Sequence, residues 1–278
     1  MSDLFVFVND VFVPASEASL LVSDLAIQRG YGIFDFLKAI DHTPVFPDEH
    51  LARFLHSARQ LRLEVGKSKE ELLALIYLLM EKNNLPDCGI RLTLTGGYSP
   101  DGYTLSKPNL VITQSPLQLP TPELFEKGIK LVSYPHQRQL PETKSIDYLM
   151  AVWLQPFIKE KGADDVLYHK DGVISECPRS NFFIVTADDT LVTPSENILK
   201  GVIRGKVLQL TQQQFRTEQR PVTLDEIYAA REAFITSTTK LIMPVTRVDG
   251  RTIGEGVPGK ASGWIREALT IQLRKSRE

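Results

Sequence analysis

Three prolines within eight residues divide this chain into two parts. They lie in the stretch Ser115-Pro116-Leu117-Gln118-Leu119-Pro120-Thr121-Pro122. Proline opposes both a helix interior and a central strand, because it lacks an amide donor and its φ is fixed. We therefore place a linker at residues 116–122, between a small N-terminal domain at 1–115 and a larger domain at 123–278. A length of 278 residues is sufficient for two such domains.

The N-terminal part combines strands and helices, which predicts an α+β domain. Apolar runs at 5–8 and 11–13 flank Asn9-Asp10 and predict a β-hairpin. Apolar residues recur at helical spacing over 48–64, and Ser68 with Glu71 forms a capping box before a second helix. Residues 90–95 and 110–113 are rich in β-branched and apolar residues, which predicts strands.

The C-terminal part alternates strands with helices. Strands are expected at 129–134, 165–170, 173–176, 181–186 and 190–193, and helices near 145–160, 203–215 and 258–274. The Asp171-Gly172 pair predicts a tight turn between two of these strands. The fold is therefore expected in the α+β or α/β class.

The charge balance gives no global attraction to nucleic acid or to an anionic membrane. The chain has 32 Lys and Arg against 34 Asp and Glu, a net charge of -2, so an anionic ligand must be bound locally. No run approaches the roughly 18 apolar residues of a membrane span, and Met1 to Leu4 lack a basic signal-peptide region, so a cytoplasmic location is expected. Two cysteines, Cys88 and Cys177, and five scattered histidines predict neither a disulfide framework nor a metal site.

Lys144 and Glu176 are the strongest candidates for chemistry. Lys144 lies in the run Thr143-Lys144-Ser145-Ile146-Asp147-Tyr148, and Glu176 follows at the far end of the predicted hairpin. Taken alone, each is expected to be a surface charge, because Lys and Glu are seldom buried without a partner. Together they suit pyridoxal chemistry, which needs a lysine that forms a Schiff base and a carboxylate opposite the ring nitrogen.

Three further segments could bind a phosphate group. Gly201, within Leu199-Lys200-Gly201-Val202-Ile203-Arg204, permits a tight turn after which backbone amides point along a helix axis. Thr236-Ser237-Thr238-Thr239 ends a predicted strand with consecutive hydroxyls, and Arg53 carries a forked guanidinium on the first helix. The structural alternatives are a strand-to-helix turn, a β-turn and a solvated helix face.

The order of these segments resembles the class IV aminotransferases, the fold-type IV pyridoxal-phosphate enzymes, nearly end to end. The segments that carry the resemblance are Asp24 to Phe36, with Arg29-Gly30-Tyr31-Gly32-Ile33-Phe34-Asp35, then His50 to Ser57, Lys144 to Leu149, Gly172 to Val185, Leu199 to Arg204 and Phe234 to Gly250. The family includes D-amino-acid transaminase, which this chain resembles most, branched-chain aminotransferase and aminodeoxychorismate lyase. The resemblance implies a smaller N-terminal α+β domain, a larger C-terminal domain with a β-barrel-like core, and a homodimer in which the second subunit completes the pocket.

The resemblance also implies roles for individual residues. The matching lysine carries pyridoxal 5'-phosphate, which makes Lys144 the catalytic residue, and the matching glutamate, Glu176, pairs with the pyridine nitrogen. Phosphate-binding positions are matched by Arg53, the amides of Val202 and Ile203, and Thr238, and a tyrosine near the cofactor's phenolic oxygen is matched by Tyr148. Many relatives have Thr where this chain has Ile203, from which we expect slightly weaker cofactor retention.

The implied reaction moves an amino group between an amino acid and a 2-oxo acid. D-amino-acid transaminases bind the substrate carboxylate with an Arg and a His, and Asp101 and Tyr103 replace them here. Our hypothesis is that Arg29, Arg179 and Thr239 bind this carboxylate instead. The alternative is that the two arginines form ion pairs with Asp35 or Glu142.

Two local patterns favour D-amino acids such as D-alanine or D-glutamate as substrates. Ser237-Thr238-Thr239 and Lys144-Ser145-Ile146 are similar to the D-amino-acid group, whereas Arg29-Gly30 and Phe34-Asp35-Phe36-Leu37-Lys38 depart from the branched-chain pattern. An L-branched-chain aminotransferase, an aminodeoxychorismate lyase and a non-catalytic binding protein that keeps the fold stay open as alternatives.

Overall fold

The computed structural model describes residues 4–275, which form two compact units. The first unit extends to Gln118 and also contains Thr143–Asp147, and the second contains Leu119–Glu142 and the chain from Tyr148 onward. The boundary after Gln118 falls inside the proline-rich stretch. Residues 143–147 differ from expectation, because they pack with the first unit although the sequence analysis assigned them to the larger domain.

The first unit is an antiparallel sheet with helices. Its elements are β1 (Phe5–Val8), β2 (Val11–Pro14), α1 (Leu25–Arg29), β3 (Gly32–Ile40), β4 (Thr43–Pro44), α2 (Pro47–Gln60), α3 (Lys69–Asn83), β5 (Cys88–Thr95) and β6 (Leu110–Pro116). The strands follow the order β2-β1-β6-β5-β3-β4. The β1–β2 hairpin and the capping box of α3 are confirmed: the Ser68 hydroxyl accepts from the Glu71 amide, and the Glu71 carboxylate accepts from the Ser68 amide.

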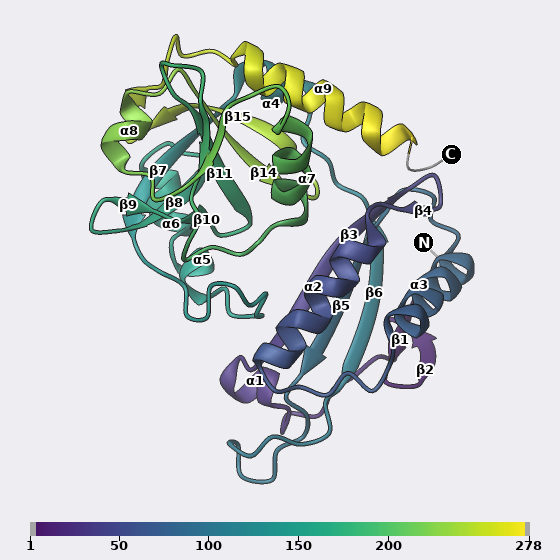
Figure 1. The fold of residues 1–278 in the computed structure, drawn as a ribbon. Coiled ribbons are helices and arrows are strands. Elements are labelled where there is room, and N and C mark those ends of the chain that lie inside the picture. The colour runs from purple at the N-terminus through teal and green to yellow at the C-terminus, as the bar shows by residue number, and fades with distance from the viewer. Residues whose placement is uncertain (1–3, 276–278) are drawn as a thin grey trace. The chain divides into compact units, whose positions relative to one another are not determined.

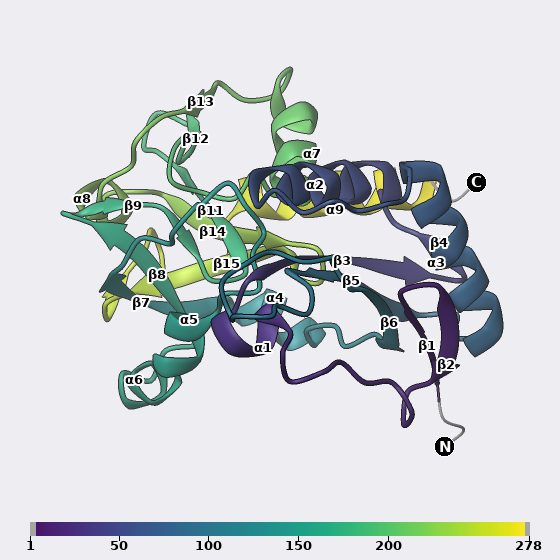
Figure 2. The same cartoon turned by 90° about the horizontal axis from the view of Figure 1, so that it is seen from below.

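Helices α2 and α3 cover one face of the sheet in the first unit. Strand residues alternate between faces, and the residues of β3 and β5 that face the core, including Leu37 and Leu92, are fully buried. They form one cluster with Leu51 and Phe54 of α2 and Ile76 of α3. Figures 1 and 2 show α2 lying along β3 and β5. This packing holds α2 rigidly beside β3.

The second unit contains a larger mixed sheet. Its strands are β7 (Ile129–Pro135), β8 (Asp165–Lys170), β9 (Val173–Ile174), β10 (Glu176–Cys177), β11 (Ser180–Val185), β12 (Leu191–Thr193), β13 (Thr217–Gln219), β14 (Glu232–Ser237), β15 (Leu241–Val248) and β16 (Arg251–Thr252). Its helices are α4 (Pro122–Lys127), α5 (Leu149–Trp153), α6 (Gln155–Glu160), α7 (Val202–Thr211), α8 (Leu224–Tyr228) and α9 (Lys260–Lys275). The main path is β13-β12-β11-β14-β15-β7-β8-β9, with β10 beside β11 and β16 beside β15, and the sheet curls (Figure 1).

Both faces of this curled sheet are packed. On one face, the rings of Phe183 and Phe234 stack at 5.0 Å between centroids. On the same face, the Glu232 carboxylate accepts from the amides of Ala261 and Ser262, both at 2.9 Å, in the first turn of α9. Residues of the opposite face, such as Ile235, join a second buried cluster. The central strands β11 and β14 are therefore held from both sides.

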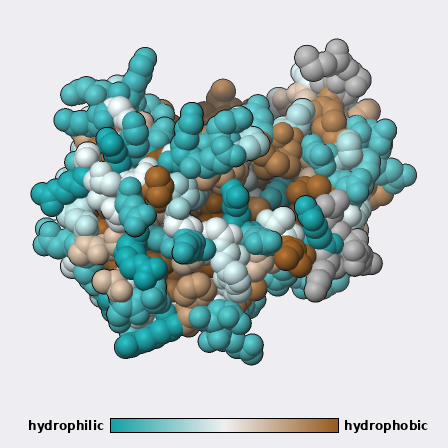
Figure 3. Space-filling view, turned by 90° about the horizontal axis from the view of Figure 1, so that it is seen from above, coloured by the Kyte–Doolittle hydropathy of each residue, from teal (hydrophilic) through white to brown (hydrophobic). Residues whose placement is uncertain are grey.

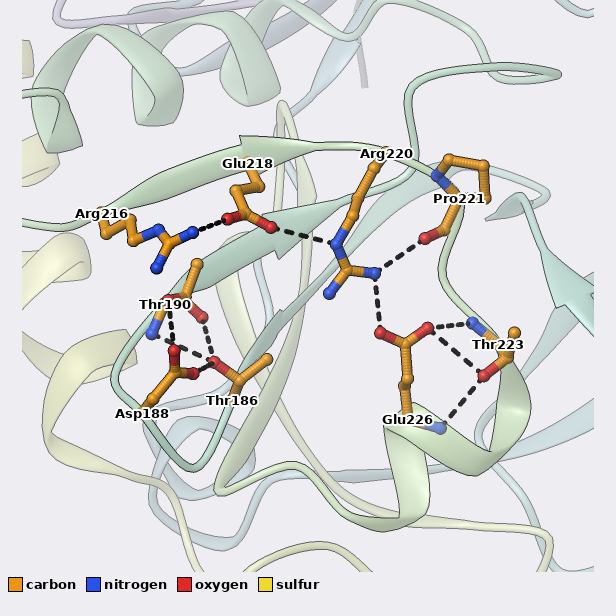
Figure 4. A network of polar contacts seen from close by, with 9 residues as sticks. All are labelled: Thr186, Asp188, Thr190, Arg216, Glu218, Arg220, Pro221, Thr223 and Glu226. Carbon is orange, nitrogen blue, oxygen red and sulfur yellow. Dashed lines mark hydrogen bonds and ion pairs between the residues drawn. The ribbon is translucent and has the colours of Figure 1, made fainter.

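Charged side chains cover the β13 edge of the sheet. Arg216 and Arg220 both pair with Glu218, and Arg220 also pairs with Glu226, which caps α8 through Thr223 (Figure 4). Charges on an edge strand oppose pairing with another strand, so we assign this network a structural role. On the face drawn in Figure 3, hydrophobic residues form small groups between hydrophilic ones. Within residues 4–275, no helix is both long and apolar enough to cross a membrane.

Several predicted elements have different boundaries in the structure. The helix expected near 145–160 begins only at Leu149 and is divided at Leu154, because the Lys144 carbonyl and the Ile146 amide bond to β3 and Pro156 supplies no amide donor. The strand expected at 173–176 is divided at Ser175, whose amide donates to the Tyr168 carbonyl, so Glu176 begins a new strand. The helix expected at 203–215 ends at Thr211.

Candidate functional site

Lys144 is fixed in the first unit by backbone contacts on both sides. Its amide donates to the hydroxyl of Ser57 on α2 at 3.1 Å, and its carbonyl accepts from the Phe34 amide at 2.9 Å. The Ile146 amide donates to the Gly32 carbonyl at 3.0 Å. Gly32 permits this approach, since a Cβ there would lie only 3.1 Å from Ile146 Cδ1. The backbone of Lys144 is therefore held against the first residues of β3.

The side chain of Lys144 lies beside an aromatic ring. Its Nζ atom is 4.5 Å from the ring centroid of Phe34, and the guanidinium carbon of Arg91 is 3.8 Å from the same centroid. A cation at this distance is attracted to the ring, but the ring does not accept a proton from it. Lys144 is partly buried, which suits an amine that reacts in a sheltered site.

Asp35 anchors a buried polar network on the face of β3 opposite to Phe34. Its carboxylate accepts from Arg53 Nε and Nη2, both at 2.8 Å, and its Oδ1 lies 2.7 Å from His50 Nδ1. Asp35 and His50 are fully buried. Burial raises the pKa of Asp35, but the charge and hydrogen bonds of Arg53, together with the hydrogen bond from His50, outweigh burial and hold this pKa well below its usual range.

His50 is neutral in this network. Burial lowers the pKa of His50, and the Asp35 carboxylate only partly opposes that effect. At 2.7 Å from a carboxylate, Nδ1 must carry the proton, so the 3.2 Å contact between this nitrogen and Arg53 is not a hydrogen bond. Nε2 is left without a hydrogen-bond partner among the described residues. Arg53 was expected to bind phosphate, and two of its nitrogens are occupied by Asp35.

Glu176 lies in the second unit and is almost completely enclosed. Its Oε1 accepts from Arg138 Nε at 2.9 Å and Nη2 at 2.8 Å, while Oε2 accepts from the Leu199 amide at 3.0 Å and from Asn181 Nδ2 at 3.3 Å. Its side chain is only 5% exposed. A surface charge, the ordinary alternative for Glu176, is therefore excluded, and the carboxylate has a fixed orientation.

Asn181 connects Glu176 with the start of α7. Its Nδ2 also donates to the Leu199 carbonyl at 2.7 Å, and its Oδ1 would overlap with a Cβ built on Gly201. Gly201 is the N-cap of α7, and no side chain bonds the first turn there. Because the first amides of a helix have no partner within the helix, those of Val202 and Ile203 can bind an anion. The side chains of Val202 and Ile203 are buried.

The hydroxyl-rich segment at the end of β14 differs along its length in burial and in hydrogen bonding. Thr236 pairs with Asn181 in the sheet register, is 2% exposed, and its Oγ1 has no partner among the described residues. Ser237 Oγ accepts from the Lys240 amide at 3.1 Å, and Thr238 and Thr239 are partly buried in the turn before β15. Tyr148 precedes α5 in the same unit.

The two arginines proposed for carboxylate binding are both exposed. Arg29 Nη1 donates to the Gln28 carbonyl at 2.9 Å, and its guanidinium carbon lies 5.2 Å from the ring centroid of Tyr103. The alternative partners are occupied otherwise, since Asp35 pairs with Arg53 and His50, and Glu142 lies 3.4 Å from Lys200. Asp101 accepts four hydrogen bonds within its own loop, two of them from the amides of Tyr103 and Thr104, and so has a structural role.

Sequence reasoning missed the partners that hold these groups. Arg138, Asn181 and Ser57 contact Glu176 or Lys144 directly but were not singled out, and Asp35 was considered only as a partner for an arginine. Two of these contacts join residues far apart in the chain: Arg138 and Glu176 are 38 positions apart, and Ser57 and Lys144 are 87 positions apart. The order of segments could have directed attention to Asn181, which lies inside the 172–185 segment, but not to Arg138.

Comparisons with known proteins agree on the family but not on the substrate. A family model described as amino-transferase class IV matches residues 32–248. The chain is 30% identical over 270 residues to the D-alanine aminotransferase of Bacillus licheniformis, with 95% of each chain covered. It is also 30% identical over 274 residues to the putative branched-chain-amino-acid aminotransferase of Methanocaldococcus jannaschii, with 94% of each chain covered.

The fold is similar to that of solved structures. The branched-chain amino acid aminotransferase from Escherichia coli superposes with a TM-score of 0.89 at 24% identity, over 98% of this chain and 95% of that chain. This likeness confirms the expected fold class, with a smaller α+β unit and a larger unit built on a curled sheet.

Proposed function

This chain belongs to the class IV aminotransferase family, and from this premise we propose that it is a pyridoxal-phosphate-dependent transaminase whose favoured amino donors are D-amino acids such as D-alanine or D-glutamate. A 2-oxo acid is the acceptor. The observation that carries the proposal is the fixed Lys144, whose backbone bonds to Ser57 and Phe34 and whose Nζ lies beside the Phe34 ring. A lysine held in this way is suited to covalent catalysis rather than to a surface charge.

The residues of the second unit fit pyridoxal phosphate. The enclosed Glu176 carboxylate offers a negative charge of fixed orientation to a ring nitrogen. The uncapped first turn of α7 offers amides to a phosphate, and the buried Thr236 Oγ1 still lacks a partner among the described residues. A Cβ on Gly201 would overlap with Asn181 Oδ1, so a glycine is required at the N-cap of this turn.

Each group then has a role in the reaction. The bound cofactor supplies an electron-withdrawing ring that stabilises the negative charge developing at the substrate α-carbon. Lys144 Nζ would hold the cofactor covalently and, once released, would take the α-proton and return it. Glu176 would keep a proton on the ring nitrogen, while the amides of Val202 and Ile203 would bind the phosphate. We also keep Arg53, Thr238 and Tyr148 as proposed cofactor contacts.

The preference for D-amino acids is supported by the similarity to the Bacillus licheniformis enzyme and by Ser237-Thr238-Thr239. The second candidate is an L-branched-chain aminotransferase, which is favoured by the equal identity to the Methanocaldococcus jannaschii protein. Initial rates for D- and L-amino acids, with pyruvate or 2-oxoglutarate as acceptor, separate the two. We expect the highest kcat/KM with D-alanine or D-glutamate, and a preference for L-leucine or L-isoleucine would overturn this assignment.

We further propose that Arg29 and Arg179, with Thr239, bind the substrate α-carboxylate. Their exposure and the occupation of Asp35 and Glu142 by other cations support this role. Loss of a charge-assisted hydrogen bond costs about 1.5–3 kcal/mol, so Arg179→Ala is expected to raise KM about tenfold to a hundredfold. Arg231→Ala, which removes an arginine paired with Asp189 at the surface of the same unit, is the control. An unchanged KM in Arg179→Ala contradicts the carboxylate role.

A homodimer and a cytoplasmic location complete the proposal. Exposed apolar side chains on the short helix α5 support an interface, since Leu149, Val152 and Trp153 are 73%, 69% and 62% exposed. The reduced, buried Cys88 and Cys177 are compatible with a reducing compartment. Sedimentation equilibrium of the wild type and of Val152→Glu tests the dimer: we expect a dimer that the glutamate weakens, and a monomeric wild type would contradict it.

A further inference from the structure

Arg138 is the residue that makes the closest charged contact with Glu176. It lies in the loop after β7, and its Nε and Nη2 both donate to Glu176 Oε1, at 2.9 and 2.8 Å. Its side chain is 15% exposed and that of Glu176 is 5% exposed. The pair is therefore largely removed from water, where an ion pair is screened less than at the surface.

The carboxylate experiences two opposing effects. Burial disfavours the ionised form of Glu176, whereas an opposite charge within about 4–6 Å favours it. Two further donors to Glu176, the Leu199 amide and Asn181 Nδ2, are neutral. Arg138 consequently supplies the charge that opposes the burial of this carboxylate.

The surrounding ionisable groups do not replace Arg138. On β8, Asp165 is paired with Lys240 at 3.2 Å, and burial raises the pKa of Tyr168. Burial also raises the pKa of Cys177 on β10, so that Tyr168 and Cys177 both stay neutral. Arg204 on α7 is near enough for its charge to interact with Glu176. Its guanidinium, however, donates to Thr193, Pro194 and Gln219 rather than to the carboxylate.

We propose that Arg138 is a positioning residue that keeps Glu176 ionised and oriented, and that it thereby sets the protonation of the cofactor's ring nitrogen. This inference rests on the proposed function, because it concerns the same carboxylate. It deepens that function by assigning the control of the ring's electron-withdrawing power to Arg138, which acts on the ring through Glu176.

A purely structural role is the alternative, because Arg138 Nη2 also donates to the Pro141 carbonyl at 2.5 Å and so holds the loop that leads to Lys144. The two roles differ in their dependence on Glu176. A structural role affects the cofactor whether or not position 176 carries a carboxylate. A role through Glu176 disappears when that carboxylate is removed.

The test compares Arg138→Met, Glu176→Gln and the double variant in the full-length chain. In cofactor-free protein labelled with ¹³C-glutamate, the Glu176 carboxyl signal is identified by its absence in Glu176→Gln. We expect its titration midpoint to rise by about 1–3 pH units in Arg138→Met, the size of effect that an adjacent opposite charge has. Arg220→Met, which removes a surface arginine paired with Glu218 and Glu226, is the control and is expected to leave the midpoint unchanged.

The second readout is the pH dependence of the cofactor's absorbance in the loaded enzyme. We expect Arg138→Met to shift this dependence in the wild-type background and to leave it unchanged in the Glu176→Gln background. An unaltered carboxyl midpoint, or an equal absorbance shift in both backgrounds, overturns the proposal. If Arg138→Met does not fold, Arg138→Gln, which keeps a donor but no charge, is measured in the same way with the same expectations.

The two readouts also separate this inference from the proposed function. If the wild type shows no cofactor absorbance after pyridoxal phosphate is added, the proposed function fails. The carboxyl titration of cofactor-free protein still decides whether Arg138 controls the ionisation of Glu176.

Discussion

Replacing Asp35 by Asn tests whether the buried network on β3 stabilises the first unit. The Asp35 carboxylate accepts two hydrogen bonds from Arg53, one from His50 and one from the Phe36 amide at 2.8 Å. Asparagine has one acceptor oxygen and directs an NH2 group toward a guanidinium that can only donate. Breaking a buried ion pair by removing one partner costs about 3–5 kcal/mol, and this is the destabilisation that we expect.

The matched control is Asp48→Asn. Asp48 pairs with Lys69 at 2.7 Å, close to the 2.8 Å of the Asp35–Arg53 pair, but the Asp48 and Lys69 side chains are 68% and 37% exposed. Exposed pairs contribute about 0–1 kcal/mol. The same chemical change at a similar distance should therefore cost much less unfolding free energy. The difference between the two losses measures the contribution of burial.

The assay is urea unfolding followed by far-UV circular dichroism, with hydrogen exchange of peptides from β3 and α2. Tryptophan fluorescence is a poor reporter here, because Trp153 and Trp264 both belong to the second unit. We expect Asp35→Asn to lower the urea midpoint and to increase exchange in β3 and α2. Equal losses of unfolding free energy in Asp35→Asn and Asp48→Asn would show that burial does not strengthen the Asp35 network.

The pH dependence gives a second check on the same variant. The folded-state pKa of Asp35 lies below its ordinary value of 3.8, so the stabilisation is complete above that value and is lost as the pH falls toward the folded-state pKa. The gap in stability between wild type and Asp35→Asn should therefore narrow as the pH is lowered below about 4. A gap that stays constant would mean that the carboxylate charge is not responsible.

Three further predictions concern the site. Gly201→Ala should crowd Asn181 Oδ1. Because overpacking costs about 1–3 kcal/mol, this variant should bind the cofactor at least fivefold more weakly in fluorescence titrations. The control Gly205→Ala, which has open space around its Cβ, should bind the cofactor as the wild type does. Between pH 7.5 and 5.5, His50→Gln should lose about 1 kcal/mol less unfolding free energy than the wild type. The pKa of His50 is lowered in the folded protein, so only the unfolded wild-type chain gains a proton at this position as the pH falls. Equal losses of unfolding free energy in urea titrations would contradict this. Lys144→Ala should abolish transamination in a coupled assay, and retained turnover would exclude Lys144 as the catalytic base.

Local patterns predicted most elements correctly because the interactions that form them are close in sequence. The capping box joins Ser68 with Glu71, and the first hairpin turns at Asn9, whose φ of 56° is a conformation that Asn tolerates. The boundaries that failed depend on distant contacts. Residues 145–147 do not join the helix that follows them. The Lys144 carbonyl and the Ile146 amide bond instead to β3, more than a hundred positions earlier.

The order of several weak motifs along the chain is a one-dimensional property, and it was enough to predict the family, the cofactor chemistry and the candidates Lys144 and Glu176. The groups that hold those candidates in place became visible only in the folded molecule. Arg138 reaches Glu176, Ser57 reaches Lys144, and Asp35 joins His50 with Arg53 because folding brings distant segments together and excludes water around them. The environment of a charge depends on burial and on partners across the fold, and these arise only when the sheets and helices pack.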